Sequence, residues 1–102
     1  MKPVAIVPGE AVLSALNGVN AGKNTLLLDG IIIGRASDCT LRLTDAAVSR
    51  QHARLRYGAG RWYIQDMNSA GGTYVNGTQV NAVPLNNGDR IRIGSNEFEF
   101  RE

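Results

Sequence analysis

A serine and the only histidine of the chain lie three residues apart, at Ser49 and His52. In a serine hydrolase, an imidazole takes the proton of the attacking hydroxyl and a carboxylate orients that imidazole. Here no carboxylate follows at a recognisable spacing, and Ser49 lies in no nucleophile elbow. A single histidine is more often a structural hydrogen-bonding group than a base. We therefore expect that this chain is not an enzyme.

Arginine offers a second kind of chemistry, the binding of an anion. Nine of the eleven cationic residues are arginines, and six of these lie between positions 35 and 61, where the only acidic residues are Asp38 and Asp45. The guanidinium group presents a planar fork of donors that matches phosphate or carboxylate. Arg35 and Arg50 fall at predicted turns, from which a side chain can reach a ligand. The arginines interpreted as solvated strand faces are Arg42, Arg54, Arg56, Arg90 and Arg92.

The composition excludes several classes of site and location. The single cysteine, Cys39, cannot form an internal disulfide, and we interpret it as a small buried side chain. With one histidine and one cysteine the chain offers no metal site, and nothing predicts another cofactor. No apolar run approaches the roughly 18 residues of a membrane span, and prolines near the start interrupt any signal peptide. These features predict a cytoplasmic protein that does not bind a membrane.

The pattern of apolar residues predicts short strands and few helical residues. No stretch of helical length repeats its apolar residues every 3.6 positions, whereas two-residue alternation recurs between turn residues. At the end of the chain, Phe98 and Phe100 alternate with charged residues, which predicts one apolar face. The predicted strands span residues 12–16, 25–28, 31–33, 41–43, 52–57, 62–66, 73–75, 79–80, 90–93 and 97–101.

Three further expectations follow from this pattern. Residues 25–28 and 31–33 are unbroken apolar runs, so we expect both strands to be covered on both faces. In the strand at 52–57, alternation places His52 on the side opposite Ala53. At 102 residues the chain has the size of one domain. We expect an extended tail at residues 1–10 and a single sandwich domain at residues 11–102.

Three predicted loops carry the polar residues. Arg35 follows the strand at 31–33 directly, and Ser49 precedes the strand at 52–57. A third loop, residues 68–72, precedes the strand at 73–75. Adjacent strands of a sandwich bring such loops together at one end, where binding residues are common. The sequence therefore predicts that these loops form one site.

The three loops contain motifs in a fixed order, namely Gly34-Arg35, Ser49-x-x-His52 and Gly72-Thr73-x-x-Asn76-Gly77. In order and spacing, the motifs resemble the signature of the forkhead-associated (FHA) domain. The resemblance extends over residues 12–101 through a frame of other matching positions: Cys39, Leu43, Ala53, Trp62, Ile64, Asp66, Leu85, Gly88-Asp89, Ile91 and Ile93-Gly94.

The resemblance implies an all-β sandwich of two mainly antiparallel, twisted sheets with about 10–11 short strands. It also implies a non-catalytic module for phosphothreonine-dependent protein–protein interaction. Phosphothreonine carries about −1.5 to −2 charges and three acceptor oxygens, which suits a site rich in arginine. The implied partner is a threonine-phosphorylated protein or peptide, functionally linked to a Ser/Thr protein kinase.

The matched positions imply residue roles. Arg35 is expected to contact the phosphate, Ser49 to donate its hydroxyl to a phosphate oxygen, and Arg50 to reach the same phosphate. The other residues expected to bind the phosphopeptide are Ala70, Gly71 and Thr73. The residues expected to support the binding loops are Gly34, His52, Gly72 and Asn76.

The chain departs from the family pattern at Ala70-Gly71, where family members commonly have a threonine followed by an asparagine that holds the peptide backbone. The departure keeps open a phosphate-independent scaffold or oligomerisation domain of the same fold. A third alternative is nucleic-acid binding through the arginines. It is disfavoured, because the arginines alternate along strands and do not interleave with aromatic residues, of which there are six. We therefore expect no nucleic-acid partner.

Overall fold

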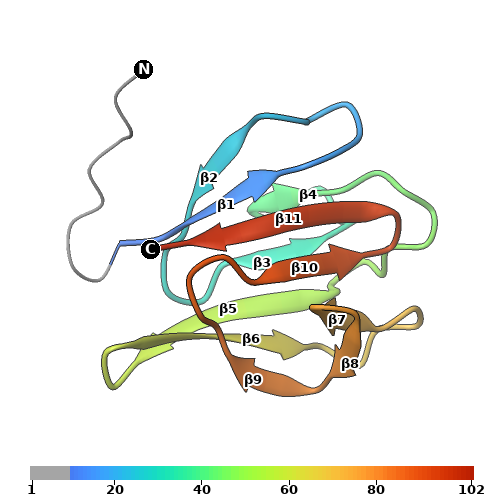
Figure 1. Cartoon of the computed structure of the whole chain (residues 1–102). Coiled ribbons are helices and arrows are strands. Elements are labelled where there is room, and N and C mark those ends of the chain that lie inside the picture. The colour runs from blue at the N-terminus through green and yellow to red at the C-terminus, as the bar shows by residue number, and fades with distance from the viewer. Residues whose placement is uncertain (1–9) are drawn as a thin grey trace.

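The structure is a computed structural model that describes residues 10–102. Eleven strands lie in this part of the chain, and they form two sheets packed as a sandwich (Figure 1). In chain order the strands are β1 (Val12–Ala15), β2 (Asn24–Leu26), β3 (Ile32–Gly34), β4 (Leu41–Arg42), β5 (Ala53–Gly58), β6 (Arg61–Asp66), β7 (Thr73–Val75), β8 (Thr78–Val80), β9 (Ala82–Pro84), β10 (Arg90–Ile93) and β11 (Asn96–Arg101).

One sheet has six strands and the other has five. The order in the six-stranded sheet is β2-β1-β11-β10-β7-β8, and the order in the five-stranded sheet is β4-β3-β5-β6-β9. Neighbouring strands pair antiparallel, apart from the short parallel pair of β3 and β4. This topology confirms the predicted all-β sandwich of two mainly antiparallel sheets.

Alternating residues of both sheets build the core. Leu13, Ile91 and Phe100 of the six-stranded sheet are buried, as are Leu55 and Ile64 of the five-stranded sheet. Burying one such side chain stabilises a fold by about 1.5–3 kcal/mol relative to leaving it exposed. A close-packed core of this kind fixes the strand ends, and therefore fixes the loops relative to one another.

The edge strands differ from the expectations. The prediction that residues 25–28 are covered on both faces is wrong, because Leu26 is 51% exposed and Leu28 63% exposed. β2 is the outermost strand of its sheet, and only Leu27 beside it is buried. In β3, Ile32 is also partly exposed. The pattern does not predict β9, an outermost strand that contains Pro84, and edges are where a sheet tolerates proline.

Two other expectations concern the start of the chain and its cysteine. The tail expected at residues 1–10 lies outside the described residues, except for Glu10, whose side chain is exposed. Cys39 is partly exposed and not fully buried, and its Sγ lies 3.1 Å from the Arg50 carbonyl oxygen. Within residues 10–102, no helix is long and apolar enough to cross a membrane.

Three strand ends meet at one end of the sandwich. The register pairs Ile33 with Ala53, and Ala53 with Asp66. The end of β3, the start of β5 and the end of β6 therefore lie side by side, and the loop after β6 crosses to β7 in the other sheet. We name this region the loop end; it contains loops 35–40, 43–52 and 67–72.

Candidate functional site

Arg35 leaves β3 where that strand ends, and backbone acceptors hold it in place. Its backbone N–H donates to the Ser49 carbonyl oxygen at 3.0 Å, and its side-chain Nε donates to the Val48 carbonyl oxygen at 3.0 Å. The side chain is exposed. Within residues 10–102, the two terminal nitrogens of its guanidinium have no hydrogen-bond partner. A planar pair of donors is therefore free to receive an anion.

Gly34 allows loop 43–52 to cross closely over β3. A Cβ built at Gly34 would lie 2.2 Å from the Arg50 carbonyl oxygen and 3.0 Å from the Cys39 sulfur. The same carbonyl accepts the Ala36 N–H at 3.0 Å. Any side chain at position 34 would push the loop away, and the Arg35–Ser49 contact with it.

Ser49 connects loop 43–52 to loop 67–72. Its hydroxyl oxygen accepts the Ala70 backbone N–H at 2.9 Å, which leaves the hydroxyl hydrogen free to be donated. Its own backbone N–H donates to Nδ1 of His52 at 3.0 Å. Direct bonds thus run from Arg35 to Ser49 and from Ser49 to Ala70, as the loop prediction requires.

His52, which was expected to support the binding loops, is fully buried beneath them. A backbone N–H can only donate, so the bond from Ser49 assigns an unprotonated Nδ1. The ring proton is then on Nε2, which donates to the Gly72 carbonyl oxygen at 2.8 Å. The neutral imidazole therefore joins loop 43–52 to the end of loop 67–72.

Asp66, which was matched only as part of the frame of the family resemblance, orders loop 67–72. Its carboxylate accepts the Ser69 hydroxyl at 2.5 Å, the Ser69 N–H at 3.0 Å and the Thr73 hydroxyl at 2.8 Å. Burial raises the pKa of Asp66, but these hydrogen bonds outweigh it and hold the pKa below the ordinary value. The Ser69 oxygen in turn accepts the Gly72 N–H at 3.0 Å. A carboxylate followed by hydroxyls at such short range is a local signal for this role.

Two of the expected site residues lie away from the exposed surface of the site. Thr73 is fully buried and donates to Asp66, so the expectation that it contacts a peptide is wrong and its role is to support the loop. Asn76 accepts the Arg90 N–H at 2.9 Å and donates to Asp89 at 3.0 Å. The bond with the Arg90 N–H fastens neighbouring backbone, as expected. It lies at the end of β7 that is remote from Gly72, so Asn76 supports β7 and not loop 67–72.

Ala70 and Gly71 are exposed where loop 67–72 faces loop 43–52. A Cβ built at Gly71 would lie 3.2 Å from the Ala47 carbonyl oxygen, so a larger residue would press on that loop. The Gly71 N–H has no hydrogen-bond partner within residues 10–102. Arg50 is exposed, and its side chain likewise forms no hydrogen bond or ion pair in the described chain. The site is thus rich in unpaired donors, which suits an anionic ligand.

Asp45 anchors loop 43–52 to the turn between β10 and β11. Its carboxylate accepts the Ser95 hydroxyl at 2.7 Å, the Ser95 N–H at 2.8 Å and the Ala47 N–H at 3.0 Å. A Cβ at Gly94 would lie 2.6 Å from the same carboxylate, so the turn approaches closely because it has a glycine there. This anchor is not predicted from the sequence, where its only local signal is an aspartate two residues before Ala47.

We expect the Asp45 carboxyl to titrate near pH 2 in the folded protein. The Ala47 N–H and both donors of Ser95 lower the pKa of Asp45 from 3.8 to about 2. Because the folded pKa is the lower one, the anchor stabilises the loop end fully above the unfolded pKa and is lost as the pH falls through about 2. The Ser95 amide shift, followed by NMR during acidification, reports this titration. Asp45→Asn should abolish it, and a midpoint at the ordinary carboxyl value would contradict the prediction.

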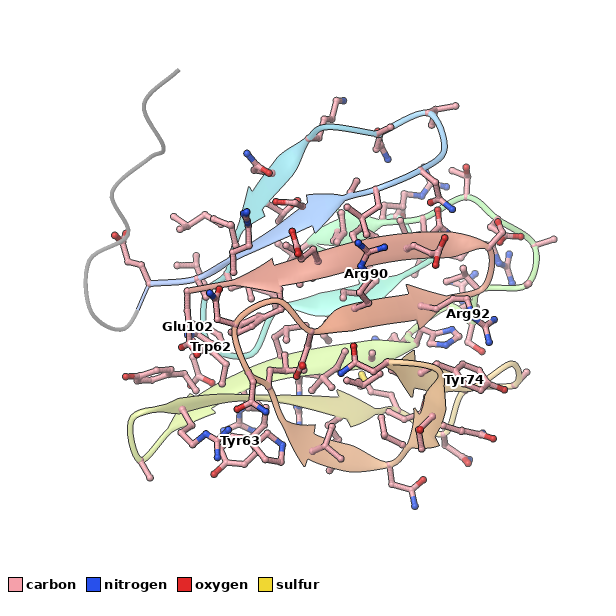
Figure 2. All side chains as sticks on the ribbon, viewed as in Figure 1. Trp62, Tyr63, Tyr74, Arg90, Arg92 and Glu102 are labelled. Atoms are coloured by element: carbon pink, nitrogen blue, oxygen red, sulfur yellow. The ribbon has the colours of Figure 1, made fainter. Side chains whose placement is uncertain are left out.

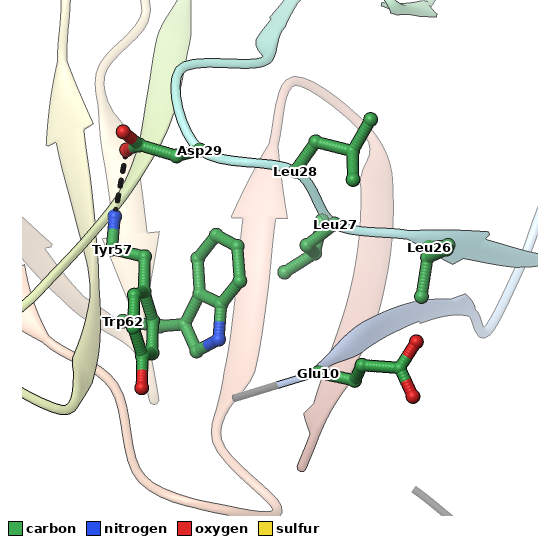
Figure 3. A pocket seen from close by; sticks show the side chains of 7 residues that line it. All are labelled: Glu10, Leu26, Leu27, Leu28, Asp29, Tyr57 and Trp62. Atoms are coloured by element: carbon green, nitrogen blue, oxygen red, sulfur yellow. Dashed lines mark hydrogen bonds between the residues drawn. The ribbon is translucent and has the colours of Figure 1, made fainter. Parts of the chain in front are cut away.

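The described chain contains no group of three or more His, Cys, Asp or Glu side chains that could hold a metal ion. A shallow hollow of about 220 Å³ lies at the end of the sandwich opposite the loop end (Figure 3). Its walls include Leu26, Leu28, Tyr57 and Trp62, with Asp29 at one side. It contains none of the expected site residues. The polar site at the loop end and this apolar hollow are therefore separate features.

Known proteins resemble this chain in both sequence and fold. Residues 31–94 match the family model of the FHA domain. The glycogen accumulation regulator GarA of Mycobacterium tuberculosis is 39% identical over 94 residues, which cover 91% of this chain and 58% of GarA. The chain therefore spans less than two thirds of the length of that relative.

Solved structures agree with this match. A solved FHA domain, studied for its phosphothreonine-dependent interactions, aligns with a TM-score of 0.84 and 35% identity over 91% of this chain and 96% of that one. EmbR of Mycobacterium tuberculosis, solved with a low-affinity phosphopeptide, aligns with a TM-score of 0.83 and 34% identity over 90% of this chain and 24% of EmbR.

Proposed function

The chain belongs to the FHA domain family, and we propose that it is a phosphothreonine-dependent protein-interaction module that captures a phosphorylated segment at the loop end. One observation carries the proposal: backbone bonds hold the Arg35 side chain against loop 43–52, and the hydroxyl of Ser49 lies in the same loop. A fork of cationic donors and a hydroxyl donor are thus fixed together before any ligand arrives.

The chemistry of phosphothreonine matches these donors. The phosphate carries about −1.5 to −2 charges and three acceptor oxygens. Hydrogen bonds to charged groups contribute about 1.5–3 kcal/mol each, more than neutral ones. Arg35 supplies two such bonds, Ser49 a third, and Arg50 adds charge from the same loop. The solved relatives with phosphothreonine-dependent interactions or a bound phosphopeptide support the same ligand class here.

The bonds of His52 support a non-catalytic role. Its Nδ1 accepts the backbone N–H of Ser49, and its Nε2 donates to the Gly72 carbonyl oxygen. The imidazole therefore has no free lone pair to take the proton of the Ser49 hydroxyl, as a hydrolase would require. That proton remains available to a phosphate oxygen.

The hydrogen bonds to the backbone of the bound peptide are expected to come from main-chain donors of the domain. Ala70-Gly71 replaces the threonine and asparagine common in the family, so no side-chain amide is present. The exposed and unpaired N–H of Gly71 can donate to a peptide carbonyl in its place. The proposed partner is a threonine-phosphorylated protein, a substrate of a Ser/Thr protein kinase, encountered in the cytoplasm.

A library of phosphothreonine peptides, titrated beside the unphosphorylated twin of each peptide, tests the proposal. We expect at least about tenfold preference for the phosphorylated member of the best pairs, because several charge-assisted bonds exist only with the phosphate. Equal binding of both members would contradict the proposal. A stable complex or oligomer that persists after phosphatase treatment would favour a phosphate-independent scaffold.

A further inference from the structure

The outer side of the five-stranded sheet carries an excess of arginines. Alternation places Ala53, Leu55, Trp62 and Ile64 in the core, so the residues between them point outward. Four arginines lie on this outer side, and we name them the arginine face: Arg42, Arg54, Arg56 and Arg61.

Few carboxylates balance this charge. Within residues 10–102, only two arginines lie within 4.0 Å of a carboxylate: Arg56 with Asp29 at 3.1 Å, and Arg101 with Glu99. The outer side of the six-stranded sheet is different, because Arg90 and Arg92 lie opposite Glu99 and Glu97 in the register (Figure 2). The modest net charge of +2 therefore conceals one face with a surplus of positive charge.

Arg54 in particular lacks a strong partner. Its contact with Gln65 Oε1 is long, at 3.4 Å, and its buried Nε has no hydrogen-bond partner in the described part of the chain. A buried donor without an acceptor is unfavourable. Within residues 10–102 this guanidinium forms no ion pair, and Asp29, the carboxylate that interacts with it electrostatically, is already paired with Arg56.

The arginine face begins at the proposed phosphate site. Gly34 lies on the outer side of β3, as Ile32 does. The carbonyl oxygen of Arg50 lies directly over Gly34. Arg42 Nε donates to the Arg35 carbonyl oxygen at 3.1 Å, which joins the first arginine of the face to the site. A ligand that leaves the phosphate site on this side meets Arg54 and then Arg56.

We propose that the arginine face binds an acidic segment of the same partner, about three to five residues from its phosphothreonine. An extended chain rises about 3.3 Å per residue. Arg54 pairs with Ile32, three positions before Arg35 on β3, and Arg56 lies two positions further along β5. Arg54 and Arg56 are therefore three and five positions from Arg35, or roughly 10 and 17 Å along the strand direction. An extended peptide needs the same number of residues to reach them. The inference rests on the proposed phosphothreonine-dependent function.

The face fits an acidic polypeptide better than a nucleic acid. Single strands bind on aromatic side chains that stack with successive bases. Among the described strand residues on this outer side, Tyr63 is the only aromatic one, and it lies opposite Arg56 in the register (Figure 2). Carboxylates can pair with guanidinium groups spaced along a strand without such a platform.

Fluorescence anisotropy with extended peptides tests the inference. The best phosphothreonine peptide from the library is lengthened with three glutamates, or three glutamines, three to five residues before or after the phosphothreonine. At about 20 mM salt we expect glutamates on one of the two sides to strengthen binding about three- to tenfold over glutamines, and most of this gain to disappear at about 0.5 M salt. Arg54→Gln/Arg56→Gln should remove the gain but retain binding of the glutamine peptide.

Arg90→Gln/Arg92→Gln is the matched control, since it removes the same charge from the outer side of the other sheet. Equal affinity for the glutamate and glutamine peptides would overturn the inference but leave the phosphate site intact. The inference would also be overturned if the control variant lost as much of the glutamate gain as the Arg54→Gln/Arg56→Gln variant. Absence of any phosphate-dependent binding would overturn both proposals. Binding of a DNA duplex that requires Arg54 and Arg56 and competes with the acidic peptide would assign the face to nucleic acid and overturn the inference.

Discussion

Arg35→Ala is expected to weaken the binding of a phosphothreonine peptide by about 100-fold or more. The substitution removes both free donors of the guanidinium, and charge-assisted bonds of this kind contribute about 1.5–3 kcal/mol each. It also removes the bond from Nε to the Val48 carbonyl oxygen, which is a neutral acceptor on loop 43–52. We expect that smaller loss to leave the sandwich folded, because the core lies elsewhere.

Isothermal titration with the phosphorylated peptide measures the effect, and thermal unfolding checks the fold. Arg35→Lys keeps the charge but not the fork of donors, so it should recover part of the affinity. Arg90→Ala removes an exposed arginine of the other sheet and serves as the control for charge. An Arg35→Ala domain that is folded and binds within about threefold of the original would be incompatible with a phosphate site at Arg35.

His52→Ala is expected to reduce the free energy of unfolding by about 3 kcal/mol or more. The side chain is 0% exposed, and its removal leaves a cavity together with an unpaired Ser49 N–H and an unpaired Gly72 carbonyl. Each orphaned group costs about 1–3 kcal/mol. For a domain of this size the midpoint of thermal unfolding should fall by roughly 12 °C or more. Phosphopeptide binding should weaken too, because the two loops lose their connection.

Calorimetry or circular dichroism measures the unfolding change. Gln51→Ala is the matched control, since Gln51 is the exposed neighbour of His52 and its side chain forms no hydrogen bond within residues 10–102. Substitution of such a surface residue changes stability by no more than about 0.5 kcal/mol. If His52→Ala and Gln51→Ala unfolded at the same temperature, the buried imidazole would not be the connection described above.

Alternation predicts β5, β10 and β11, each of which has a neighbouring strand on both sides. In β10, Ile91 and Ile93 are buried while Arg90 and Arg92 are exposed, because one face of the strand lies on the core and the other lies in solvent. The same reasoning was wrong for residues 25–28. The exposure of Leu26 and Leu28 depends on the position of β2 at the edge of its sheet, and no residue of that segment encodes that position.

The residues of the site also divide into those that the sequence predicts and those that it does not. Resemblance to a family placed Arg35, Ser49 and Ala70 on loops that the structure joins by direct bonds. It did not assign a role to Asp45, whose partner Ser95 lies 50 residues further along the chain. Such a bond depends on how the two sheets pack, so neither local propensity nor spacing predicts it.

The bonds at the loop end join the two sheets to each other. Loop 43–52 leads into the five-stranded sheet, whereas Gly72 and Ser95 border strands of the six-stranded sheet. Arg35 and Ser49 can therefore face the same ligand as the Gly71 N–H only while the two sheets remain packed together. A phosphorylated partner at 100 times its dissociation constant would add about 2.7 kcal/mol to the stability of the folded domain. Phosphorylation of a partner would thus make the domain that recognises it harder to unfold, because only the folded domain holds these donors together.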